Sequence, residues 1–169
     1  YILGNLDFAM IALALIVLDN ERPGIDHLVG IPKISPLRIL QRYVPLILRF
    51  GVGFAMIFLA VYEKILNPHL SELVVTNFGL MNVVPVSPEM WVLSTGLIEF
   101  AVGLALILGL FTRISAGIAF IVLSLSFFYF GEDVASHITL FGTLSVLFIT
   151  QGGAWSLDKL LYRTNPDFT

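Results

Sequence analysis

The chain has 169 residues, of which 57% are hydrophobic and 12% are charged, and its formal net charge is −3. A soluble domain carries roughly 25% charged residues, so this composition excludes an ordinary water-soluble protein and is typical of an integral membrane protein. The chain has no basic tract, which excludes a nucleic-acid partner, and no cysteine, which excludes disulfides, iron–sulfur ligation and thiol chemistry.

Long apolar runs predict five membrane-spanning helices. A helix needs roughly 17 to 25 apolar residues to cross a hydrocarbon layer of about 30 Å. The predicted fold class is therefore an all-α integral membrane protein, with a four-helix transmembrane bundle and one preceding transmembrane helix. The apolar runs lie at about 2–18, 45–63, 91–110, 114–130 and 134–150.

The predicted helix within residues 1–30 lies outside the four-helix unit, which we expect to cover 46–169 together with an interfacial C-terminal tail. Residues 31–45 are predicted to be an interfacial linker, because Arg38 and Arg42 share one face of a short helix there. At an offset of 132 residues the first apolar helix aligns with the last one. This parallel repeat leaves two interpretations open: the first helix is the end of an earlier four-helix unit, or it is a single added helix.

The distribution of basic residues predicts the orientation of the chain in the membrane. Two connections and the C-terminal tail hold nearly all the Lys and Arg, whereas the other two connections hold only Lys64. Lys and Arg are enriched on the cytoplasmic side, so we expect a multi-pass protein of the plasma membrane with a cytoplasmic C-terminus. The residues on the predicted cytoplasmic side are Arg22, Lys33, Arg38, Arg42, Arg113, Lys159 and Arg163.

The connection 64–90, on the predicted outer side, has apolar residues at helical spacing. This spacing predicts a short helix that covers the outer end of the bundle, before Pro85 and Pro88 interrupt it. The apolar positions are Leu66, Leu70, Leu73, Val74, Phe78 and Met81.

Glu99 is the acidic residue of an otherwise apolar predicted span. An ionised carboxylate at the middle of a membrane helix costs about 2.5 to 3.5 kcal/mol, so we expect Glu99 to face protein and not lipid. Gly96, Glu99 and Gly103 recur at i, i+3 and i+7, which places them on one face where another helix can approach closely. Glu99 lies about 12 Å below Trp91 at the helical rise, in the outer half of the membrane.

That depth selects the expected partners of Glu99. Lys64 at the outer end of its helix and His137 about one turn into its own both lie within reach, and Asn5 and Asp7 are additional candidates. Arg49 enters from the opposite side and is expected to extend toward the inner head groups. We therefore favour a cluster of Glu99, Lys64 and His137 over a pair of Glu99 with Arg49.

Two interpretations of this cluster remain open. Glu99 and a basic partner form a buried pair that fixes the register of two helices. Alternatively, the cluster binds a quinone head group or relays a proton, because a desolvated carboxylate beside an imidazole exchanges protons near neutral pH. A transport or lipid site is a further alternative.

The predicted inner side holds three polar residues that are interpreted as anchors: Arg49, Arg113 and Asp158. Arg49 and Arg113 are expected to contact lipid phosphates, and Thr112 is expected to cap the helix that follows it. Asp158 is expected to cap or tether an interfacial helix over 157–163. No spacing of His, Asp or Glu indicates a metal site.

Five stretches of the chain, in this order, resemble the DoxX/DoxD-like family of small four-helix membrane proteins. The resemblance covers about residues 46–161. The stretches are RFGVG at 49–53, YEKIL at 62–66, IEFAVG at 98–103, LGLFTR at 108–113 and GGAWSLD at 152–158.

The resemblance implies a role near membrane redox chemistry, because related proteins form the membrane part of thiosulfate:quinone oxidoreductase. We therefore expect a membrane subunit of a quinone-linked redox complex, with a quinone as the cofactor and none held within the chain itself. Its expected partners are membrane lipids and other membrane or soluble subunits, which supply the electrons. The alternatives are a non-catalytic structural subunit that binds lipids and a small transporter.

Overall fold

The computed structural model describes residues 6–18, 40–131 and 134–164, and every regular element in these ranges is a helix. The all-α membrane fold class is thereby confirmed, and each of the five predicted spans coincides with one long helix. These helices are α1 (Leu6–Leu18), α3 (Val44–Leu59), α5 (Pro88–Leu108), α6 (Thr112–Phe130) and α7 (Val134–Thr150).

Shorter elements join the long helices. A π-helical segment, η3 (Ala60–Leu66), continues α3 without a break. It leads into α4 (His69–Asn77) and the 3₁₀ turn η4 (Leu80–Asn82), so the predicted helix within 64–90 is present. The last helix is α8 (Leu157–Thr164), close to the predicted range 157–163.

Three helices of the described residues are long and apolar enough to cross a membrane: Leu40–Leu66, Pro88–Leu108 and Thr112–Tyr129. Two further apolar helices, Leu6–Leu18 and Ile138–Thr150, are shorter than a full crossing requires. The count of five complete spans therefore stays a prediction. The repeat that pairs the first helix with the last stays a prediction, and most of the predicted linker 31–45 falls outside the described residues.

Local sequence signals set the ends of these helices. The Ser87 hydroxyl caps α5 by accepting a hydrogen bond from the Met90 N–H at 3.4 Å, and Pro88 occupies the first turn, where its missing N–H is not needed. At the other end, Gly109 adopts a left-handed conformation with φ 64° and stops the helix. The α5–α6 connection is therefore tight.

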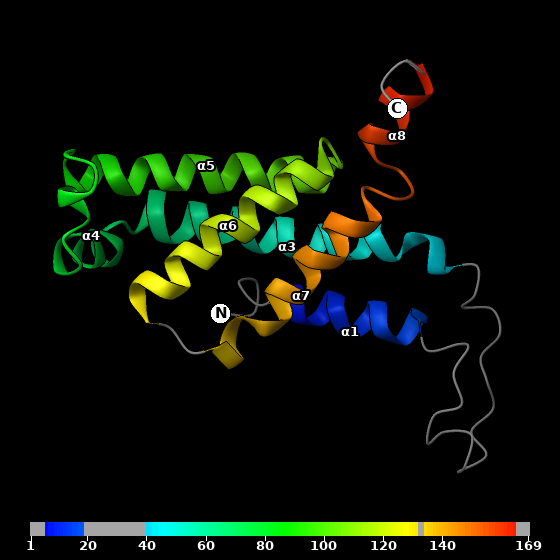
Figure 1. Ribbon diagram of the computed structural model, residues 1–169, viewed down its shortest axis with the longest axis horizontal. Coiled ribbons are helices and arrows are strands. Elements are labelled where there is room, and N and C mark those ends of the chain that lie inside the picture. The colour runs from blue at the N-terminus through cyan, green and yellow to red at the C-terminus, as the bar shows by residue number, and fades with distance from the viewer. Residues whose placement is uncertain (1–5, 19–39, 132–133, 165–169) are drawn as a thin grey trace, which may run out of the picture.

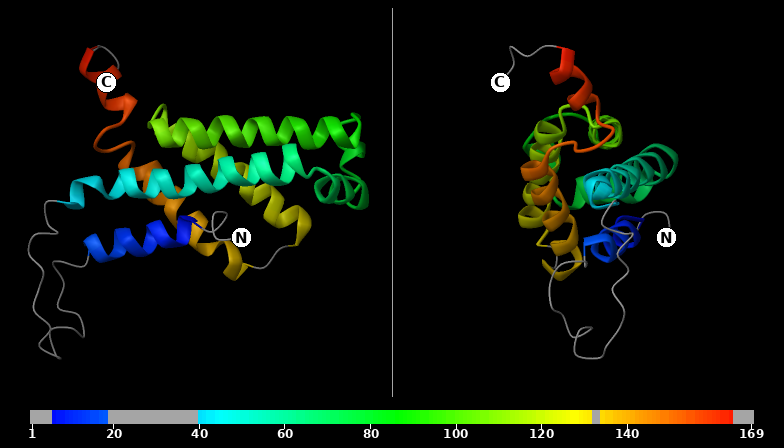
Figure 2. Two further views of the ribbon diagram at one scale, coloured as in Figure 1. Left: turned by 180° about the vertical axis from the view of Figure 1, so that it is seen from behind. Right: turned by 90° about the vertical axis from the view of Figure 1, so that its right-hand side faces the viewer.

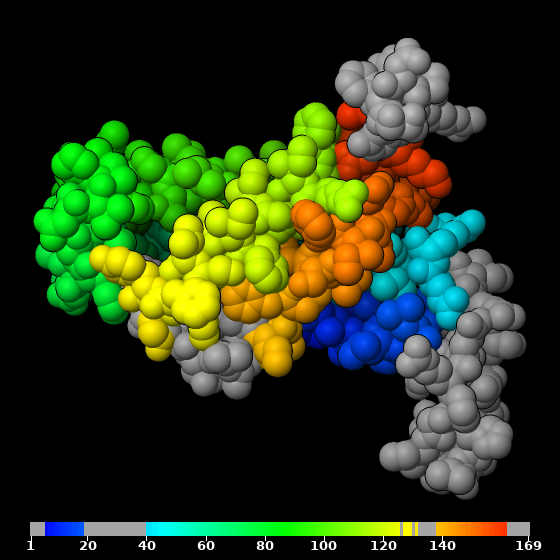
Figure 3. Space-filling model, in the orientation of Figure 1, coloured from blue at the N-terminus to red at the C-terminus, as the bar shows by residue number. Residues whose placement is uncertain are grey.

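The central helix of the bundle is α3, which packs against α1, α5 and α7. Figures 1 and 2 show α3 and α5 running antiparallel side by side, with α6 and α7 crossing them on one face and α1 beside α3. Figure 3 shows α6 and α7 covering that face together. The bundle therefore buries α3 more than any other long helix, which places functional side chains on α3 inside protein.

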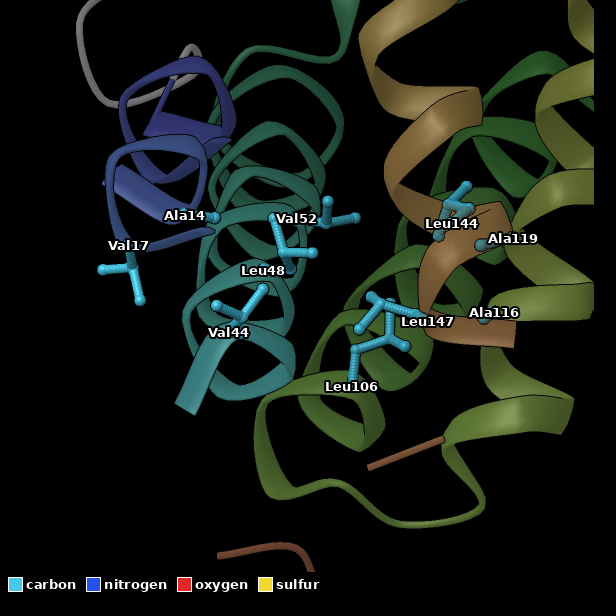
Figure 4. Close-up of a cluster of buried hydrophobic side chains, with 10 residues drawn as sticks. All are labelled: Ala14, Val17, Val44, Leu48, Val52, Leu106, Ala116, Ala119, Leu144 and Leu147. Carbon is cyan, nitrogen blue, oxygen red and sulfur yellow. The ribbon is translucent and has the colours of Figure 1, made fainter. Parts of the chain in front are cut away.

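A cluster of buried apolar side chains joins all five long helices, as Figure 4 shows. Burying these side chains against one another excludes lipid and fixes the helix positions through close packing. The cluster consists of Ala14, Val17, Val44, Leu48, Val52, Leu106, Ala116, Ala119, Leu144 and Leu147.

Glycines allow α3 to approach two neighbouring helices closely. A Cβ atom at Gly53 would lie 2.6 Å from the Gly103 carbonyl oxygen, and one at Gly103 would lie 2.7 Å from the Gly53 carbonyl oxygen. On the other side of α3, a Cβ atom at Gly51 would lie 2.7 Å from Cβ of Met10 in α1. The Gly-Val-Gly sequence of α3 therefore serves two helix crossings at once.

The bundle has two ends with different polar contacts. The Lys64 end holds η3 and α4, and the Arg49 end holds the start of α3, the α5–α6 turn and residues 151–158. At the Arg49 end, α8 runs across the direction of α3 and α5 (Figure 1). This arrangement suits a helix that lies along a membrane surface while α3 and α5 cross the membrane.

Candidate functional site

The side chains of Lys64 and Glu99 form an ion pair between η3 and α5. Their side chains are 19% and 20% exposed, so the pair is largely sheltered yet reachable from the surface of the bundle. The predicted contact between these two residues is present, and Glu99 makes no hydrogen bond to Arg49. The two charges neutralise each other at a depth where a lone carboxylate would be costly.

The predicted face of α5 is confirmed by its contacts with α3 and η3. A Cβ atom at Gly96 would lie 3.0 Å from Cβ of Lys64, and Gly103 lies at the crossing with Gly53. Glu99 lies between these two glycines on the same face and reaches Lys64. Glycine at position 96 leaves space for the aliphatic part of Lys64, so the ammonium group can extend toward Glu99.

Of the other predicted members of the cluster, the structure describes the side chain of Asp7, which lies away from the ion pair. Asp7 is buried against α3 at Gly51, where its Cα lies 3.3 Å from a Cβ atom added to that glycine. Gly51 precedes Lys64 by about 20 Å at the helical rise, so Asp7 lies too far away to contact the pair. The backbone of His137 is part of α7, but its side chain and all of Asn5 lie outside the described residues.

At the opposite end of the bundle, Arg49 is completely buried. Its Nη2 atom donates hydrogen bonds to the carbonyl oxygens of Ala154 and Trp155, at 3.2 and 3.3 Å. The expectation that Arg49 extends toward the inner head groups is therefore not met, because backbone carbonyls of residues 151–158 bind its guanidinium instead. A buried cation held by carbonyls is a fixed point of the fold and not a lipid anchor.

Asp158 caps a helix that lies far from it in the sequence. Its carboxylate oxygens accept hydrogen bonds from the backbone N–H groups of Phe111 at 2.5 Å and Thr112 at 2.8 Å, at the start of α6. Its own N–H donates to the carbonyl oxygen of Gly109 at 2.9 Å. The carboxylate thus satisfies unpaired donors at a helix N-terminus, where negative charge is also favoured.

The predicted capping role of Thr112 is wrong, whereas Asp158 has the second of its two expected roles, a tether for the helix that follows. Thr112 does not cap α6, because Phe111 occupies the N-cap position and Asp158 supplies the acceptor. Asp158 does not cap α8; the Ser156 hydroxyl accepts the hydrogen bond from the Lys159 N–H at 3.2 Å. Asp158 tethers α8 to the α5–α6 turn instead.

Close packing explains the glycines at the Arg49 end. A Cβ atom at Gly109 would lie 1.6 Å from Nη1 of Arg49, so only glycine fits beside the guanidinium. A Cβ atom at Gly152 would lie 2.7 Å from the Ser156 hydroxyl oxygen and 2.9 Å from that of Thr112. Both glycines are therefore required by the side chains packed on them.

Arg113 and Trp155 lie at the surface of the same end. Arg113 is exposed, and its guanidinium carbon lies 5.2 Å from the centre of the Phe148 ring, a cation–π contact across α6 and α7. Trp155 is 81% exposed and adopts a positive φ of 58° while Arg49 binds its carbonyl oxygen. Arg113 therefore remains the predicted anchor that is free to reach a lipid phosphate.

The contacts among Arg49, Asp158 and Thr112 could not be derived from any single motif. The available signal was that RFGVG, LGLFTR and GGAWSLD each contain both glycine and a polar residue. In the structure these three stretches meet at one end of the bundle. Their chemistry is structural, because the buried groups bind backbone atoms, whereas the partly exposed Lys64–Glu99 pair can meet a ligand.

The sequence matches a known protein family. The sequence profile of the DoxX family matches residues 44–132, more than half of the chain, and this range includes Arg49, Lys64 and Glu99. Searches among curated proteins and among solved structures gave no match. With its apolar helical bundle and this family match, the chain belongs to the DoxX family of membrane proteins.

Proposed function

We propose that this chain is a membrane subunit of a quinone-linked redox complex, and that the Lys64–Glu99 pair meets the quinone head group. The observation that supports this proposal is a charged pair within the apolar bundle that is about one fifth exposed. Membership of the DoxX family, which is often linked to quinone-related functions, favours the same class of ligand. His137 on α7 remains a candidate third member of the site.

The two side chains have complementary chemistry toward a quinone. The Lys64 ammonium group donates hydrogen bonds, which the carbonyl oxygens of a quinone accept, whereas the Glu99 carboxylate accepts from the hydroxyl groups of a quinol. Reduction of a quinone to a quinol takes up two electrons and two protons. An electron carrier in a partner subunit supplies the two electrons, and Glu99 takes up the two protons one at a time from the bulk solvent and passes them to the quinone.

A structural subunit is the second candidate function. The direct contact of Lys64 with Glu99 favours it, because two opposite charges that satisfy each other hold α5 against η3 without any ligand. In this alternative the exposed apolar faces of α5 and α6 pack on other membrane subunits and on lipids. The same experiment separates the two functions.

The experiment is purification of the protein from its native membranes in a mild detergent, followed by mass spectrometry of copurifying quinone and polypeptides. The test variant is Glu99→Gln, and the matched control is Glu89→Gln, the same change at an exposed position of the same helix. Loss of one charged hydrogen bond, about 1.5 to 3 kcal/mol, corresponds to about a tenfold or greater loss of bound quinone.

We expect quinone with the wild type and the control, and the loss only with Glu99→Gln. Equal quinone in all three proteins would contradict the assignment of Glu99. The structural function would be supported instead if the wild type copurified with other subunits but without quinone, and if Glu99→Gln lost those subunits.

A further inference from the structure

The segment that carries Lys64 has an unusual helical geometry. Residues Ala60–Leu66 form a π-helix of 7 residues that continues α3 directly. In a π-helix the N–H of residue i+5 binds the carbonyl of residue i, so the chain turns less per residue than in an α-helix. By Lys64 the side chain has therefore rotated away from the direction that a continued α-helix would give it.

Asn67 holds the end of this wide turn through two donors. Its backbone N–H donates to the Tyr62 carbonyl oxygen at 3.1 Å, which is the i+5 bond of the π-helix, and its side-chain amide donates to the same oxygen at 2.9 Å. The next residue, Pro68, lacks an N–H and disfavours the helical conformation at Asn67, which has φ −132° and ψ 60°. Asn67 thus ends the π-helix at a defined residue.

A second side chain supports the same turn from α4. The Ser71 hydroxyl donates to the Glu63 carbonyl oxygen at 3.4 Å, so the carbonyls of Tyr62 and Glu63 both accept from side-chain donors. Phe58 and Tyr62 stack with ring centres 5.5 Å apart and an angle of 6° between the rings. These contacts fix the segment immediately before and after Lys64.

On α5 the space for Lys64 is narrow. The Cβ of Lys64 already lies 3.0 Å from the position that a Cβ atom at Gly96 would occupy. A rotation of η3 would therefore move the lysine stem off this glycine and move its ammonium group away from Glu99. The ion pair depends on the angle at which η3 presents Lys64.

We propose that Asn67 is a positioning residue, which keeps η3 in its π-helical form and so directs Lys64 toward Glu99. Asn67 is itself exposed and contacts neither charge, so it acts through the backbone. This inference concerns the same pair as the proposed function but does not require a quinone. Its test measures the energetic coupling between Lys64 and Glu99, whereas the proposed function is tested by bound quinone. Each proposal can therefore fail while the other stands.

The test is a double-variant cycle repeated in two backgrounds. Apparent Tm in detergent is measured for Lys64→Met, Glu99→Gln and the double variant, first in the wild-type chain and then with Asn67→Ala. Two residues in contact give Tm shifts that do not add, whereas uncoupled residues give shifts that add. We expect non-additive shifts in the wild type and additive shifts in the Asn67→Ala background.

A matched control separates positioning from general stabilisation. Thr76→Ala removes another exposed polar group nearby, a hydroxyl that donates only to the Glu72 carbonyl of its own helix at 2.8 Å, and the coupling should survive this change. Coupling that persists with Asn67→Ala, or that is missing in the wild type, overturns the proposal.

Discussion

Asp158 accepts a hydrogen bond at 2.8 Å from the backbone N–H of Thr112, which precedes it by 46 residues. Through this contact the start of α8 caps the start of α6, and the C-terminal helix becomes part of the bundle. The side chain that holds the adjacent turn, Arg49, comes from α3. The Arg49 end is therefore closed by three segments that are remote in the sequence.

Removal of the Asp158 carboxylate should destabilise the bundle. Asp158→Ala leaves two N–H groups at the start of α6 without an acceptor and leaves the nearby Arg49 without its opposite charge. Loss of a helix cap costs roughly 0.5–2 kcal/mol, and we expect a loss of about 2 kcal/mol here. The loss is measured by unfolding in detergent, and the control is Lys159→Ala, a change at the exposed neighbouring residue. Equal stabilities of the two variants would contradict the capping role of Asp158.

Replacement of Arg49 should release the C-terminal helix. Arg49→Met removes the donors to the carbonyl oxygens of Ala154 and Trp155, and hydrogen bonds to charged groups contribute about 1.5–3 kcal/mol. We expect trypsin to cleave after Lys159 several-fold faster than in the wild type. The control is Arg113→Met, an arginine lost from the surface, and unchanged cleavage in Arg49→Met would show that α8 is held by other contacts.

The crossing of α3 with α5 should not tolerate a methyl group. Gly53→Ala places Cβ 2.6 Å from the Gly103 carbonyl oxygen, and we expect it to destabilise the bundle by about 1–3 kcal/mol. The control is Gly142→Ala, where nothing lies within 4 Å of the added Cβ, and this change should stabilise α7 by about 0.5–1 kcal/mol. If thermal unfolding gives the two variants the same stability, the result contradicts the close approach of α3 and α5.

The predicted orientation can be tested with single cysteines because the chain has none of its own. Glu89→Cys and Lys159→Cys introduce one thiol at each end of the bundle, both at exposed positions. A membrane-impermeant maleimide should label the Glu89→Cys variant in intact cells and the Lys159→Cys variant only after permeabilisation. The reverse pattern would place the C-terminus outside the cell.

Much of the fold follows from the sequence through local physical rules. Apolar runs of crossing length located the five long helices, and helical spacing located the short helix α4. The spacing of Gly96, Glu99 and Gly103 placed these residues on one face, and the depth of Glu99 selected Lys64 as its partner. These inferences succeeded because a charge in hydrocarbon is costly and its depth follows from its position along one helix.

The π-helical turn could not be foreseen in the same way. π-Helices are rare, and whether one forms here depends on which donors reach the Tyr62 and Glu63 carbonyls. Those donors are Asn67 and Ser71, and the hydroxyl of Ser71 comes from the next helix. Periodicity assumes a constant turn per residue, so it does not detect such a change.

What the sequence determined by itself is therefore the membrane class, the helices and the inward face of α5, because hydrophobicity and helical period act over neighbouring residues. Only the tertiary structure decided that Arg49 binds the carbonyls of Ala154 and Trp155 and that Asp158 caps α6. A buried arginine or aspartate needs a partner, but the partner's identity depends on which helix ends the folded bundle brings together. That choice is made by packing between remote segments, which the local sequence pattern does not encode.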